Sequence, residues 1–171
     1  MHVAVIFVGA IADGGFNASA HAGVEAAGTL PGVEVLVPIS TTYEPASMAA
    51  ALDSAAQAAG PGGLDVFVGG QGDGVAPGVA ARWADRRFAV VQGAVVAPNL
   101  SSCHLRQDDS AYLAGVLAAH ASDGTVGHLS GHRVTLELRG RAAFVAGARS
   151  VIPDIRVLTA FCGTQDDAAV A

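Results

Sequence analysis

The sequence contains no lysine, so all nine of its Lys and Arg positions are arginines, against fifteen Asp and Glu residues and a formal net charge of −6. The lack of lysine excludes a Schiff-base lysine and the phosphate-binding lysine of a P-loop. So few cations provide no basic field for a phosphate backbone. We therefore expect no nucleic-acid partner.

Cysteine and long apolar runs are also scarce. The two cysteines, Cys103 and Cys162, lie far apart without CxxC spacing, which predicts neither a disulfide framework nor a zinc site. No uninterrupted apolar run approaches the ~18 residues that a membrane span needs, and no charged leader precedes the first apolar residues. We expect no membrane insertion and a cytoplasmic location, or an extracytoplasmic one if a signal segment has been removed.

What the sequence does contain is a regular alternation of short apolar runs with longer Ala-rich stretches. Continuous runs of Val, Ile and Phe are typical of parallel strands that are buried on both faces. Pro and Gly stand just before several of these runs, where the loops from helix to strand belong. The pattern predicts a doubly wound α/β fold with strands at 3–8, 33–37, 65–68, 88–91, 100–105, 125–131 and 155–161, and helices at 16–29, 45–59, 75–84, 109–120 and 133–151.

The stretch "ADGGFN" follows the first expected strand and opens the first expected helix. Open α/β sheets bind ligands at this end of their strands. Asp13 can accept paired hydrogen bonds, Asn17 can donate and accept, and Phe16 can pack beside a ring. The alternative, in which Asp13 or Asn17 only caps the helix and Phe16 belongs to the core, stays open.

Six segments together resemble a known family. They are "GAIADGGFNASAHAGVEAA", "GLDVFVGG", "RRFAVVQG", "DDSAYLAGVLAA", "GTVGHLSG" and "AAFVAGARSVIPDIRVL". In this order and spacing they are similar to the basic membrane protein family, the purine-nucleoside-binding substrate-binding proteins of ABC importers. The resemblance implies a type I periplasmic-binding fold of two lobes, of which this sequence covers the N-terminal half, and a nucleoside site to which the Asp-x-x-Phe-Asn turn contributes.

Two positions depart from the family pattern. Gln92 stands where the family usually has an acidic residue after its fourth strand, and His21 stands where it commonly has an aromatic residue. His21 would share a helix face with Asn17. Gln71 lies in a Gly-rich loop that lets the backbone approach a ligand, although a plain turn explains that loop as well. We expect a nucleoside-like ligand to be bound by Asp13, Phe16, Asn17, His21, Gln71 and Gln92.

The histidines allow a second function class. His128 and His132 are spaced four apart, but "HLSGH" lacks the Glu of a metalloprotease motif, so we expect neither a metal nor a cofactor. His21 beside Asp13, or His104 beside Asp109, could act as a general acid and base. The alternative to a small-molecule-binding cytoplasmic sensor is therefore a cytoplasmic enzyme acting on a small metabolite.

The expected elements divide into a ligand-binding first lobe at 1–122 and a strand–helix–strand remnant of the second lobe at 123–171. A two-stranded parallel unit exposes two edges and one sheet face, so it needs a cover. A two-fold homodimer is the commonest solution for identical chains. We therefore expect the remnant to serve as an association element.

Overall fold

The computed structural model describes residues 1–163 and 169–170, and the chain forms two compact units, 1–104 and 105–171. The division therefore falls one helix earlier than the expected boundary after residue 122. Helix α4 (Gln107–His120) belongs to the second unit because it packs along α5 (Thr135–Val151). The predicted α/β class with parallel sheets is confirmed.

The first unit is built on a parallel sheet in the order β2-β1-β4-β5-β6, with β3 also paired to β1. The expected strand at 33–37 is replaced by two short strands on either side of Pro38, which has no N–H to donate to a ladder. The strands are β1 (His2–Val8), β2 (Glu34–Val35), β3 (Ile39–Thr41), β4 (Leu64–Val68), β5 (Arg87–Val91) and β6 (Leu100–Cys103).

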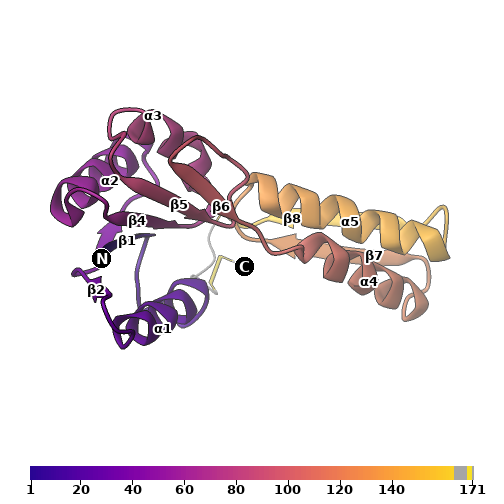
Figure 1. Cartoon of the computed structure of the whole chain (residues 1–171). Coiled ribbons are helices and arrows are strands. Elements are labelled where there is room, and N and C mark those ends of the chain that lie inside the picture. Colours follow the sequence, from indigo (N-terminus) through magenta and orange to yellow (C-terminus); the bar gives the residue numbers. More distant parts are fainter. Residues whose placement is uncertain (164–168, 171) are drawn as a thin grey trace. The chain divides into compact units, whose positions relative to one another are not determined.

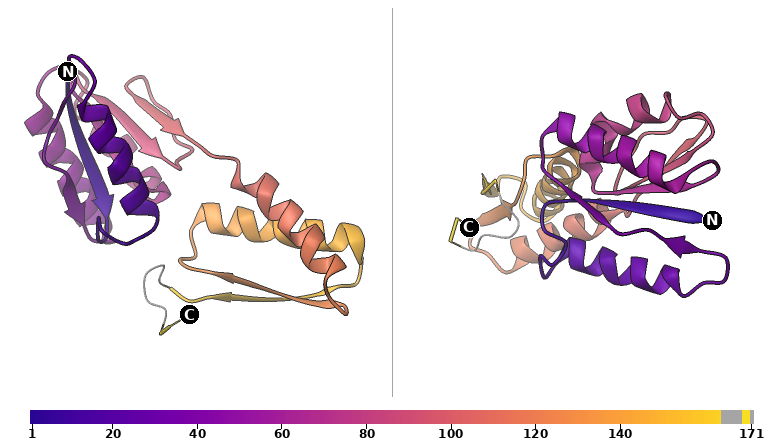
Figure 2. Two further views of the ribbon diagram at one scale, coloured as in Figure 1. Left: turned by 90° about the horizontal axis from the view of Figure 1, so that it is seen from below. Right: turned by 90° about the vertical axis from the view of Figure 1, so that its left-hand side faces the viewer.

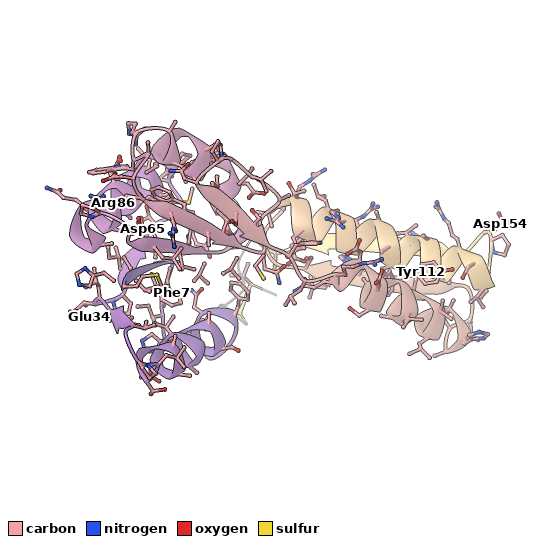
Figure 3. The ribbon with its side chains drawn as sticks, viewed as in Figure 1. Phe7, Glu34, Asp65, Arg86, Tyr112 and Asp154 are labelled. Carbon is pink, nitrogen blue, oxygen red and sulfur yellow. The ribbon has the colours of Figure 1, made fainter. Side chains whose placement is uncertain are left out.

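Helices cover both faces of this sheet, as Figure 1 shows. Helix α1 (Phe16–Gly28) packs on the face that presents Val5 and Phe7, and Figure 3 shows Phe7 on that side. Helices α2 (Pro45–Ala59) and α3 (Ala76–Ala80) cover the opposite face, where Ile6 is fully buried. Helix α3 is shorter than the expected 75–84, because the chain leaves the helix for turns at 81–82 and 84–85; the 3-10 turn η1 (Gly70–Gly74) precedes it. The core therefore lies along β1 and β4.

The second unit pairs β7 (Thr125–Ser130) with β8 (Arg156–Phe161) in parallel, and α4 and α5 lie on one face of this small sheet (Figure 2). Residues along both strands alternate between covered and exposed, so the other face is bare. Two glycines bring the helices together: a Cβ on Gly115 would lie 2.1 Å from the Phe144 carbonyl oxygen, and one on Gly147 would lie 2.0 Å from that of Tyr112. Within the described residues, no helix has the length and hydropathy needed to cross a membrane.

Candidate ligand-binding site

The carboxyl ends of the first unit's strands carry the loops that would surround a ligand. After β1 the chain passes to the face covered by α1, whereas after β3 and β4 it passes to the face covered by α2 and α3 (Figure 1). The chain thus leaves the neighbouring strands β1 and β4 in opposite directions, and such a switch point is where open α/β sheets bind ligands. Loops 9–15, 42–44, 69–74 and 92–94 lie at this edge, and the segment after β6 leaves it at His104.

Asp13 organises the loop that follows β1. Its carboxylate oxygens accept hydrogen bonds from the backbone N–H groups of Gly15 (2.8 Å), Asn17 (2.9 Å) and Ala18 (2.9 Å). Partial burial raises the pKa of Asp13, but the hydrogen bonds from these backbone N–H groups outweigh it, so the pKa lies below its usual value. Asp13 therefore caps α1 by accepting hydrogen bonds from backbone N–H groups of its first turn. From the sequence alone, this capping role and a ligand-binding role were both possible.

Asn17 fixes the same loop from the inside. Its side chain is buried, and its Nδ2 donates hydrogen bonds to the carbonyl oxygens of Val8 and Ala10, each at 2.9 Å. These carbonyls flank Gly9, whose φ of +82° is in the left-handed region. Both amide hydrogens of Asn17 are thus used to hold the chain as it leaves β1.

Phe16 and His21 lie on α1 and show different degrees of exposure. Phe16 is 40% exposed, so it is not the core residue that the alternative interpretation required. The His21 ring is partly buried, with its centroid 6.1 Å from that of Phe7, and its Nδ1 lies 3.9 Å from Glu25 Oε1. Helix α1 therefore presents an accessible aromatic ring at its first residue and an imidazole further along.

Gln71 and Gln92 stand at the ends of β4 and β5, and hydrogen bonds join their loops. The Gly69 N–H donates to the Val91 carbonyl (3.2 Å), and the Ala94 N–H donates to the Asp73 carboxylate (2.9 Å). Gln92 is buried, and it is the non-glycine residue with left-handed φ (+63°) among those described. Such a conformation is costly for a residue with a side chain and is found disproportionately at functional sites.

Sequence reasoning missed Tyr43, which follows β3 at this same edge. The side chain is 43% exposed, and a Cβ on Gly9 would lie 3.7 Å from its Oη and 3.8 Å from its Cε2. An aromatic residue two positions beyond a strand end is a usable signal. It was hidden because the strand was expected to end at 37, whereas β3 continues to Thr41.

The pairs required for acid–base chemistry are not assembled in the described part of the chain. Neither a hydrogen bond nor an ion pair joins His21 to Asp13 or His104 to Asp109 there, and Asp109 pairs with Arg106 at 3.0 Å. The residues described likewise contain no group of three or more His, Cys, Asp or Glu side chains that could hold a metal ion. What the edge does assemble is aromatic rings, amides and backbone polar groups, which suits non-covalent binding.

A parallel sheet of this order, followed along the chain by a second parallel sheet of β7 and β8, has the fold of type I periplasmic-binding proteins. The chain belongs to the family of ABC transporter substrate-binding proteins described as PnrA-like, which matches residues 1–171. The resemblance to the basic membrane protein family is thereby confirmed.

Individual relatives agree with this assignment. The chain is 39% identical over 72 residues to the ABC transporter nucleoside-binding protein BmpA of Lactococcus lactis subsp. cremoris (strain MG1363), which covers 42% of this chain and 20% of that protein. It is 35% identical over 80 residues to a purine-binding protein of Brucella abortus (strain 2308), covering 46% and 23%. A solute-binding protein of an Aeropyrum pernix K1 ABC transporter has the same fold, with a TM-score of 0.83, 24% identity, and coverage of 99% and 50%. The chain thus spans about half the length of this solved relative.

Proposed function

We propose that this chain binds a purine nucleoside, or a molecule closely similar to one, at the carboxyl edge of its first sheet. The observation that carries the proposal is the ordered loop after β1, which Asp13 and Asn17 hold at the switch point beside an exposed Phe16. The names of the two curated relatives, one nucleoside-binding and one purine-binding, support the ligand class. The role is binding, with the bound molecule released unchanged.

The residues around this edge divide into two tasks. Asp13 and Asn17 shape the loop, whereas Phe16, His21, Gln71 and Gln92 supply the surfaces and amides that meet the ligand. Amide side chains both donate and accept hydrogen bonds, as the polar edge of a neutral purine requires. Loops 9–15, 42–44, 69–74 and 92–94 contain three carboxylates and no arginine, so they would repel a phosphate group. A nucleoside therefore fits better than a nucleotide.

Thermal denaturation with added ligands tests the proposal. Adenosine, guanosine or inosine should raise the melting temperature in a concentration-dependent manner, and the corresponding monophosphates should raise it less. Mass spectrometry of small molecules released from natively purified protein should identify the same class. The proposal is rejected if no nucleoside at millimolar concentration shifts the melting temperature and none co-purifies.

The variant His21→Phe separates binding from catalysis. Phenylalanine restores the aromatic residue that the family commonly has at this position, so nucleoside affinity should be retained or improved. A decisive comparison incubates adenosine with wild-type and variant protein and analyses it afterwards. Recovery of intact adenosine from both supports a binding protein. Conversion by the wild type that is lost in the variant would contradict it.

We also propose that the bare face of the second unit's sheet joins two copies of the chain. Leu129 is 58% exposed and Leu158 is 49% exposed on this face. The strand register places Leu158 beside Gly127 and Leu129 beside Ala160. Each leucine thus lies next to a small residue. A two-fold axis through this face would let the leucines of one copy pack against Gly127 and Ala160 of the other.

Light scattering coupled to size exclusion tests this association. The wild type should elute as a dimer at tens of micromolar, and Leu158→Glu should shift it to a monomer, because the charge would be buried in the interface. Leu113→Glu, at another exposed leucine on α4, is the matched control and should leave the dimer intact. A wild-type monomer at these concentrations would exclude the homodimer.

A further inference from the structure

Tyr43 occupies a position that the backbone defines closely. Its loop joins β3 to α2, and β3 lies beside β1 in parallel register, with Ile39 opposite Ile6 and Thr41 opposite Val8. Beyond the strands, the Gly9 N–H donates to the Thr41 carbonyl (2.8 Å), and the Ser40 hydroxyl donates to the Gly9 carbonyl. The start of the Tyr43 loop is therefore tied to the end of β1, at the switch point.

The Tyr43 ring lies beside the Gly9 backbone at the carboxyl edge of the sheet. The space in which a Gly9 side chain would stand lies 3.7 Å from the tyrosine Oη, and the φ of +82° disfavours any residue with a side chain there. Asn17 holds the carbonyl groups on both sides of Gly9. The ring therefore lies beside the backbone of Gly9, which has no side chain and whose flanking carbonyl groups are held by hydrogen bonds.

Two aromatic side chains border the end of β1 from opposite directions. Phe16 opens α1 on one face of the sheet, and Tyr43 precedes α2 on the other. They are 40% and 43% exposed, while most neighbouring loop residues are Gly, Ala, Ser or Thr. Single exposed aromatic residues are ordinary on protein surfaces. Two that flank the same switch point fit the aromatic lining expected of a site for a planar ligand.

We propose that Tyr43 forms the wall of the ligand site on the α2 side, against which the planar purine base of the ligand stacks. The inference rests on the proposed nucleoside-binding function and assigns a base-recognition residue to that site. Its chemistry is the face-to-face packing of an electron-rich ring on a neutral heterocycle, which needs no charged group. The hydroxyl is not required for the stacking itself.

Isothermal titration calorimetry with adenosine and guanosine as probes tests the assignment. Tyr43→Ala should weaken binding of both by about 10-fold or more, in line with the energy of stacking one base on an aromatic side chain. Tyr43→Phe keeps the ring and should bind within about threefold of the wild type by the same principle. Tyr43→Leu keeps apolar bulk without a ring, so it should bind as weakly as alanine.

Tyr112→Ala provides the matched control, because Tyr112 is the other tyrosine of the chain, is 40% exposed, and lies on α4 in the second unit (Figure 3). It should leave both affinities unchanged. A Tyr112→Phe background makes Tyr43 the sole tyrosine. Added adenosine should then change the near-ultraviolet tyrosine band, a readout independent of affinity.

The outcomes distinguish a failure of the Tyr43 assignment from a failure of the proposed nucleoside-binding function. If the wild type binds neither probe, the proposed function fails and the Tyr43 assignment fails with it. If the wild type binds and Tyr43→Ala or Tyr43→Leu binds equally well, the assignment is overturned while the function stands. If Tyr43→Phe is as weak as Tyr43→Ala, the hydroxyl and not the ring face is responsible, which also overturns it. Melting of the unliganded variants shows whether they fold.

Discussion

Replacing Asp65 by asparagine should stabilise the first unit at neutral and alkaline pH. Asp65 lies in β4 between β1 and β5, is 0% exposed, and neither carboxylate oxygen has a hydrogen-bond partner among the residues that the structure describes. Burial raises its pKa from 3.8 to about 7, although the positive charge of Arg86 acts in the opposite direction. Figure 3 shows Asp65 and Arg86 at the same end of the sheet.

The sign and size of the effect follow from proton linkage. The folded state holds the Asp65 proton more tightly than the unfolded state, so stability from this group is complete below pH 3.8 and is lost as pH rises to about 7. At about 1.4 kcal/mol for each tenfold change in proton affinity, ionisation costs about 4 kcal/mol at pH 8. Asparagine resembles the protonated acid in shape and never ionises. Its advantage should therefore approach about 4 kcal/mol at pH 8 and vanish near pH 4.

Urea denaturation at several pH values measures this difference. Trp83 is the single tryptophan and lies in the first unit, so its fluorescence follows that unit. Asp53→Asn is a control for which the opposite effect is expected. Partial burial raises the pKa of Asp53, but hydrogen bonds from Arg82 (2.6 Å) and Trp83 (2.8 Å) lower it overall. That variant should lose stability at pH 8. The reasoning about Asp65 is refuted if Asp65→Asn has the same advantage at pH 4 and pH 8, or none at pH 8.

Three further predictions concern single positions. Gly147→Ala should cost about 3 kcal/mol or more in thermal melts of the second unit, because its Cβ would stand 2.0 Å from the Tyr112 carbonyl oxygen; Gly140→Ala, with open space around it, should be neutral or stabilising. Gln92→Gly relieves a left-handed φ but removes a buried side chain, so in urea the stability of the first unit should change by no more than about 1 kcal/mol, whereas nucleoside binding in calorimetry should weaken. Asp13→Ala should cost about 1 kcal/mol at pH 7 and abolish ligand-induced thermal stabilisation, and its stability cost should shrink as pH falls below 3.8; unchanged nucleoside affinity would contradict it.

Much of the first unit could be predicted because its signals are local. Helix α2 begins and ends at the predicted residues, since Pro45 suits the first helical turn and Gly60 adopts a left-handed φ of +70° just after the last. Strand β4 differs from its prediction by one residue at its start, because a short, mostly apolar run bounded by glycines has few alternatives. Local propensity and tertiary packing agree in these segments.

The division between the units depends on a non-local fit and could not be predicted. A glycine inside a helix signals only weak helix propensity in a sequence. In the structure Gly115 and Gly147 each leave room for a carbonyl of the opposite helix, and this close packing assigns α4 to the second unit. Which residues face each other across two helices depends on the crossing geometry, and the periodicity of either helix alone does not contain it.

The candidate site was predictable in place but not in detail. The position of Asp13 and Asn17 after the first strand predicts that they lie at the carboxyl edge of the sheet, and the structure has them there. Whether they cap a helix or meet a ligand could not be decided, because both roles use the same oxygen and nitrogen atoms. The sequence identifies Gln92 as a candidate because it departs from the family pattern. Its left-handed backbone conformation could not be predicted, because it depends on how the chain turns after β5.

Hydrogen bonds of Asp13 and Asn17 tie loop 9–15 to the end of β1 and to the start of α1 without any ligand. The conformational entropy of these residues is lost when the chain folds and need not be lost again on association. A ligand that meets such a surface does not have to wait for a rare open conformer, so its capture rate should be limited mainly by diffusion and orientation. In the proposed binding function, part of the affinity would then depend on Asp13, whose oxygens accept hydrogen bonds from its own loop and helix backbone.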